Sequence, residues 1–185
     1  MGTFYQNVTL RGAAPDAVVA VLAELGRTAF VTKPAGPITV VFDSEIDAMQ
    51  AGNALPDLAG TLSVRLKCPA LAAGVYDDDV LYLSLFEGLE STFEYVSTER
   101  RVANLSHFCS VMGLRPAVLR SWLILKAPHF IPYLFETFRY LHLLRALGLP
   151  EWPYTTGYRS IERGGEAPAG LGMADLIRLR AGHVE

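Results

Sequence analysis

Three consecutive carboxylates, Asp77-Asp78-Asp79, are the first side chains in this sequence that could carry chemistry. Carboxylate oxygens are preferred ligands of hard cations, so the triplet could form a divalent-metal module or support metal-assisted hydrolysis. A usable site would need further oxygens from elsewhere, and Asp43 or Glu45 at a neighbouring strand end are candidates. The alternating ligands of an EF-hand loop are missing. Asp also favours hairpin turns, so the alternative interpretation is a solvated turn between two strands.

Histidine and cysteine suggest no second reactive site. His107 and Cys109 lie two positions apart in an apolar stretch, and side chains at that spacing on a helix point away from each other. Cys68 and Cys109 are too few for a disulfide framework, and both are predicted to be small buried residues. Phosphate-binding glycine loops, Gly-x-Ser-x-Gly turns and paired-cysteine motifs are absent from the sequence. The sequence therefore predicts no catalytic residue and no cofactor, and it favours a protein that is not an enzyme.

Aromatic residues in the C-terminal half suggest a different kind of site. Tyrosine and tryptophan are enriched at protein interfaces, where their large rings bury much area. We predict a self-association, partner or ligand surface built from Trp122, Tyr133, Tyr140, Trp152, Tyr154 and Tyr158. The alternative is that the rings near residues 150–158 cap one end of the hydrophobic core under a loop.

The acidic triplet lies in the most regular part of the sequence. Alternating apolar and polar residues predict three antiparallel strands at 70–75, 80–86 and 89–95, joined by turns at 76–79 and 87–88. Earlier strands are predicted at 3–10, 28–32 and 38–42. A first helix is predicted from Pro15 to a stop at Gly26, and a second from Asn53 to Lys67.

The remainder of the chain is predicted to be mainly helical, with helices at 105–112, 116–126 and 132–147. A final strand is expected at 154–162 and a short helix within 173–185. The whole pattern predicts an α+β fold with a mostly antiparallel sheet in the order strand-helix-strand-strand-helix-strand-strand-strand, and with its helices on one face. Residues 1–98 would form this sheet domain, and a helical part from 99 to 185 would pack on it as one continuous globular unit.

Composition limits the classes of partner. The chain has 185 residues, of which 51% are hydrophobic and 19% charged, as is typical of globular proteins. A net charge of −3 gives no reason to expect nucleic acid. The sequence begins without the pattern of a signal peptide, and charged residues interrupt its longest apolar zone, 131–149. We therefore expect a cytoplasmic protein with no membrane segment.

Several scattered motifs resemble a set of bacterial proteins of unknown function. These motifs are Met1-Gly2-Thr3-Phe4, the run from Cys68 to Ala72 with Asp77 to Leu81, the spacing of Gly88 and Tyr95, Leu147 to Pro150, and Gly157-Tyr158. The stretch from Pro116 to Pro132 departs from that pattern. The resemblance implies a bacterial, cytosolic, folded protein and implies no activity.

These observations favour a non-enzymatic interaction or regulatory protein, of the kind represented by immunity proteins and chaperones. Its partner would be another protein or a second copy of the chain. Two alternatives remain open at this stage. One is the divalent-metal module or hydrolase that uses the acidic turn, and the other is a small-molecule sensor with a pocket between the sheet and the C-terminal helices.

Overall fold

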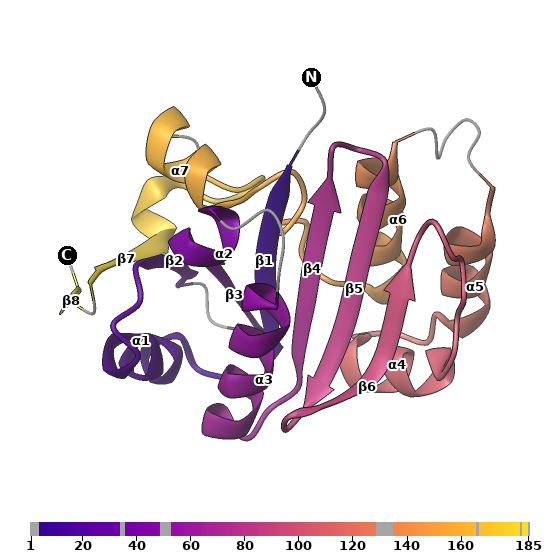
Figure 1. Cartoon of the computed structure of the whole chain (residues 1–185), viewed down its shortest axis with the longest axis horizontal. Coiled ribbons are helices and arrows are strands. Elements are labelled where there is room, and N and C mark those ends of the chain that lie inside the picture. The colour runs from indigo at the N-terminus through magenta and orange to yellow at the C-terminus, as the bar shows by residue number, and fades with distance from the viewer. Residues whose placement is uncertain are drawn as a thin grey trace.

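The computed structural model describes residues 4–33, 36–48, 53–128, 135–165, 167–181 and 183–184. A single antiparallel sheet of eight strands runs through the molecule in the order β6-β5-β4-β1-β3-β2-β7-β8 (Figure 1). Its strands are β1 (Tyr5–Arg11), β2 (Ala29–Thr32), β3 (Ile38–Asp43), β4 (Ala70–Tyr76), β5 (Val80–Glu87), β6 (Glu90–Val96), β7 (Leu176–Arg180) and β8 (His183–Val184). The α+β class and the antiparallel sheet are thus confirmed.

The centre of the sheet is β1, which pairs with β3 on one side and with β4 on the other. Val8 is opposite Val41 of β3 and Ala72 of β4. These strands are buried on both faces, as expected where helices cover both sides of a sheet. The predicted β4-β5-β6 meander forms one half of the sheet, and Gly88 supplies a φ of +79° in the tight turn between β5 and β6.

Helices pack on both faces of the sheet, which gives three layers. The helices are α1 (Pro15–Glu24), α2 (Ser44–Ala48), α3 (Ala54–Leu66), α4 (Leu105–Met112), α5 (Val118–Lys126), α6 (Glu136–Leu147) and α7 (Tyr158–Gly164). Val41 and Ala72 belong to the core that includes α1 and α3, whereas their neighbours Val40 and Leu71 belong to the core that includes α4 to α7. The C-terminal helices therefore cover the face opposite to α1 and α3.

Two predicted elements are wrong. The strand expected at 154–162 is instead a loop followed by α7, which begins where the N–H of Gly157 donates to Ser160 Oγ at 3.1 Å and the N–H of Arg159 donates to Asp47 at 2.7 Å. The helix expected within 173–185 is instead a 3-10 turn (Met173–Asp175) followed by β7 and β8. β7 pairs with β2, so its backbone groups satisfy a strand that would otherwise be an edge.

One partly buried ion pair fixes the junction between β3 and α2. The Arg27 guanidinium donates to both carboxylate oxygens of Asp43, at 2.9 and 2.6 Å. Asp43 Oδ1 also accepts the backbone N–H groups of Glu45 and Ile46, at 2.9 and 3.1 Å. Asp43 therefore starts α2 and is not available as a metal ligand beside the acidic turn.

Candidate interaction surface

The acidic triplet forms the hairpin turn between β4 and β5. Asp77 and Asp78 have φ values of 54° and 61°, the pattern of a type I′ turn, and the N–H of Asp79 donates to the carbonyl of Tyr76 at 3.0 Å. Asp78 also holds the start of α6: its carbonyl accepts the N–H of Glu136 at 2.8 Å, and its carboxylate accepts the hydroxyl of Thr137. In the described ranges, no group of three or more His, Cys, Asp or Glu residues is placed to hold a metal ion.

The six predicted surface aromatics have different environments. Tyr140 is completely buried in α6, so its assignment to an exposed surface is wrong. Trp152, Tyr154 and Tyr158 are half-buried against the core of the C-terminal face, as the capping alternative predicts. Tyr133 lies outside the described residues. Among the five of these residues that the structure describes, Trp122 alone is exposed.

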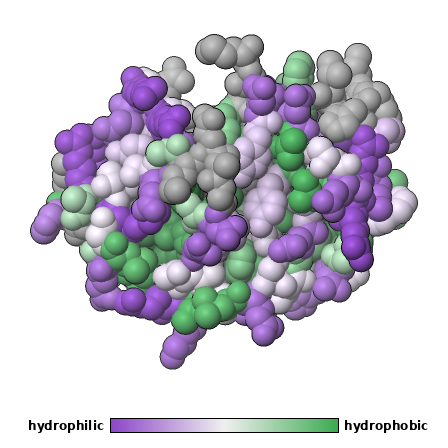
Figure 2. Space-filling model, viewed as in Figure 1, coloured by the Kyte–Doolittle hydropathy of each residue, from purple (hydrophilic) through white to green (hydrophobic). Residues whose placement is uncertain are grey.

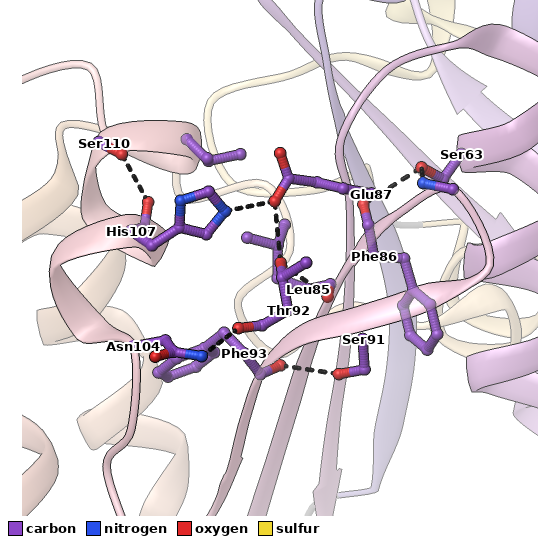
Figure 3. Close-up of polar contacts among 12 residues, drawn as sticks. Ser63, Leu85, Phe86, Glu87, Ser91, Thr92, Phe93, Asn104, His107 and Ser110 are labelled. Atoms are coloured by element: carbon purple, nitrogen blue, oxygen red, sulfur yellow. Dashed lines mark hydrogen bonds and ion pairs between the residues drawn. The ribbon is translucent and has the colours of Figure 1, made fainter.

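A polar cluster that the sequence did not suggest joins α4 to the β5–β6 hairpin. Figure 3 shows the His107 ring directed at the carboxylate of Glu87, which also accepts the hydroxyl of Thr92 at 2.9 Å. The hydrogen bond from His107 lowers the pKa of Glu87. Ser110 Oγ donates to the backbone carbonyl of His107 at 2.8 Å and not to its ring. The cluster therefore fastens α4 to the sheet and activates no nucleophile.

The thiol of Cys109 does not form a nucleophilic pair with His107. Cys109 is buried, and its desolvation raises the pKa of the thiol, which disfavours the reactive thiolate. Ser121 of α5 is its polar neighbour, and this contact offsets part of the shift. The predicted packing role of this cysteine is consistent with that environment.

The outer side of α5 exposes a group of large apolar residues. Leu119, Trp122 and Leu123 are 72%, 46% and 56% exposed, and Val118 is exposed beside them. We call these four residues the α5 face. At 100° per residue they share one side of the helix, whereas Ser121, Ile124 and Leu125 occupy the buried side. Figure 1 places α5 at the outer edge of the molecule, next to α4 and α6.

Exposed apolar residues also occur elsewhere on the molecule. In the view of Figure 2, hydrophobic residues form small separate patches among hydrophilic ones. Single exposed apolar residues such as Leu89, at the β5–β6 turn, are common on soluble proteins and call for no explanation. Four adjacent apolar residues that include a tryptophan are less common and mark candidate contact sites.

Buried side chains hold α5 from its inner side. Tyr95 Oη donates to the carbonyl of Leu125 at 2.8 Å, and Arg139 of α6 donates to the carbonyl of Ile124. Arg139 also forms a fully buried ion pair with Glu136, with 2.7 Å between Nε and Oε2. Burial raises the pKa of Tyr95 to about 12, so its hydroxyl stays protonated and donates at neutral pH. The last carbonyls of α5 are thus satisfied by fixed donors.

A shallow groove borders the α5 face on the side of α4. It has a volume of about 380 Å³. Its lining comprises Ser106, Cys109, Ser110, Gly113, Leu114, Arg115, Pro116, Ala117 and Val118. Val118 belongs to both the groove and the α5 face, so the two features are continuous.

Basic residues surround the exposed apolar ones. Arg115 is exposed just before α5, Arg120 is exposed within it, and Lys126 is its last residue. Burial and the charges of Arg145 and Arg120 lower the pKa of His142 on α6, so these cations lie close enough to repel an added proton. Exposed basic side chains therefore border the α5 face.

Comparison with known proteins gives no further assignment: the chain matches no protein-family model, no curated protein and no solved structure. Within the described residues, none of the helices has both the length and the apolar character needed to cross a membrane.

Proposed function

We propose that this chain is a non-enzymatic cytoplasmic protein that docks on a partner protein through the α5 face. The observation that carries this proposal is the group of Leu119, Trp122 and Leu123, three large apolar residues that project together from one short helix. Binding energy at protein interfaces concentrates in a few central residues, among which tryptophan is enriched. Adjacent aliphatic residues exclude water from such a centre.

The packing of the fold supports this interpretation. Ile124 and Leu125 already attach α5 to the core, so the folded chain does not need the outer apolar residues for that purpose. The buried donors Tyr95 and Arg139 hold the helix in place. A helix that is fixed before binding loses little conformational freedom when it meets a partner. Cys68 and Cys109 are free thiols, which suits the reducing cytoplasm.

The test is site-specific photo-cross-linking in cells of the source organism. A photoreactive phenylalanine analogue would replace Leu119 in one variant and Leu89 in another. Leu89 is the matched control, because it is 74% exposed but isolated at the β5–β6 turn. We expect a discrete adduct from position 119 that position 89 does not give, and we expect Trp122→Ser to abolish it. Equal labelling from both positions would refute the proposal.

A further inference from the structure

We infer that the partner protein presents acidic residues around an apolar anchor side chain, and that this anchor enters the groove between α4 and α5. The inference rests on the proposed docking function and adds the chemistry of the partner. Three observations support it: the basic residues around the α5 face, the poor fit of a second copy of the chain, and the apolar lining of the groove.

The charge of this region is opposite to that of the whole chain. Between Glu99 and Glu136 the sequence contains no acidic residue and five basic ones, Arg100, Arg101, Arg115, Arg120 and Lys126, although the chain carries a net charge of −3. Lys126 lies beside the first of these residues, because its Nζ donates to the carbonyl of Arg100 at 2.7 Å. The apolar centre therefore has a basic rim, and a partner with an acidic rim complements it.

A second copy of the chain fits this surface poorly. A two-fold contact brings the same patch of both copies together, so the basic residues at its border, such as Arg115 and Arg120, would approach those of the other copy. Like charges that meet across an interface disfavour association. No carboxylate of the 100–135 stretch is present to compensate them. The charge pattern therefore favours a different, acidic protein.

The groove defines how the partner would be anchored. Its walls are mainly apolar, with Leu114, Pro116 and Val118 on the α5 side and the buried Cys109 on the α4 side. A volume of about 380 Å³ accepts a large apolar side chain. Arg115 lines the same groove and is exposed, so a carboxylate next to the anchor would pair with it. An acidic amphipathic helix with an apolar anchor has these properties.

The experiment uses the full chain with the photoreactive residue at position 119 and adds two charge variants. The test variant is Arg101→Gln/Arg115→Gln/Arg120→Gln, which neutralises the basic rim. The control variant is Arg65→Gln/Lys67→Gln/Arg163→Gln. It removes three exposed cations, of which the first lies in α3, the second directly after α3 and the third in α7. Adduct yield is followed against time and salt concentration, and the cross-linked partner peptide is sequenced by mass spectrometry. Purified protein is also sedimented with vesicles of neutral lipid alone and with one-third anionic lipid.

We expect the test variant to form the adduct about tenfold more slowly, with the control within about twofold of the wild type, because complementary charges mainly accelerate association. The partner peptide should contain Asp or Glu beside its apolar contact residue. An adduct that is insensitive to the test variant, or a peptide without acidic residues, would overturn this inference and leave the docking function intact. If the protein sediments with the anionic vesicles but not with the neutral ones, the surface binds lipid, and the inference of an acidic partner protein is overturned as well. Absence of any adduct specific to position 119 would refute the docking function itself.

Discussion

Replacing Leu119 by Gln should change the stability of the fold very little. Burying a whole leucine side chain contributes about 1.5–3 kcal/mol. Leu119 is 72% exposed, so its buried remainder contributes less than about 1 kcal/mol. Gln and Leu have similar helix propensities, so the backbone of α5 should not be affected. The expected loss in the free energy of unfolding is therefore below about 1 kcal/mol.

Leu125 provides the comparison on the same helix. It is completely buried, and truncation of such a residue to Ala costs about 2–5 kcal/mol. In a chain of 185 residues, each kcal/mol lowers the melting temperature by about 2–4 °C. We therefore expect a decrease of about 4–20 °C for Leu125→Ala and of less than about 4 °C for Leu119→Gln. Urea unfolding monitored by circular dichroism gives the same comparison as free energies.

The outcome decides whether the α5 face serves the fold or a partner. A loss for Leu119→Gln as large as that for Leu125→Ala would mean that Leu119 packs against the rest of the chain in solution. The α5 face would then not be free to dock on a partner, because its apolar residues would already pack within the fold. A small loss for Leu119→Gln together with loss of the cross-linked adduct would separate binding from stability.

Three further predictions concern carboxylates elsewhere in the structure. Asp43→Ala should lower the free energy of unfolding, measured in urea, by about 3 kcal/mol. The variant leaves the half-buried Arg27 without its counter-ion and the first N–H groups of α2 without their hydrogen-bond acceptor. A loss below about 1 kcal/mol would contradict this. Burial raises the pKa of Asp47, so the folded state holds that proton more tightly than the unfolded state. The stability of the wild type relative to Asp47→Asn should therefore increase as the pH falls from 7 through the folded pKa, and a constant difference in urea midpoint would refute this. Finally, Asp77→Asn/Asp78→Asn should not alter the response of the melting temperature to millimolar Mg²⁺, Ca²⁺, Mn²⁺ or Zn²⁺, since the turn serves the hairpin and α6; a wild-type shift that the variant loses would restore the metal interpretation.

Local patterns in the sequence predicted most of the elements. The β4-β5-β6 meander was predictable because its side chains alternate with period two and Asp or Gly occupies each turn. The bounds of α4 were also predictable, since the helix ends at Gly113. β7 was not, because Leu176 and Leu179 suit a helix or a strand, and pairing with the distant β2 decides between them.

The candidate surface was predicted only in part, for the same kind of reason. Trp122 was predicted from its residue type, but nothing in the residue types distinguishes the exposed Leu119 and Leu123 from the buried Leu125. A helix that is apolar all round indicates burial unless its neighbours are known. Tyr140 was misassigned because α6 is buried on nearly every side, which its charged residues conceal in the sequence. The acid-free stretch from 100 to 135 is the signal that could have identified this region.

The support of α5 explains why a face that is apolar and exposed can still be well ordered. Its inner side packs through Ile124 and Leu125, and the carbonyls of those same two residues accept hydrogen bonds from Arg139 and Tyr95. Both donors are buried, so water does not compete for these bonds. The position of the helix thus depends on contacts that leave the α5 face untouched. The outer residues of α5 can therefore be changed without loss of the fold, and this separation of inner and outer residues is what the comparison of Leu119→Gln with Leu125→Ala measures.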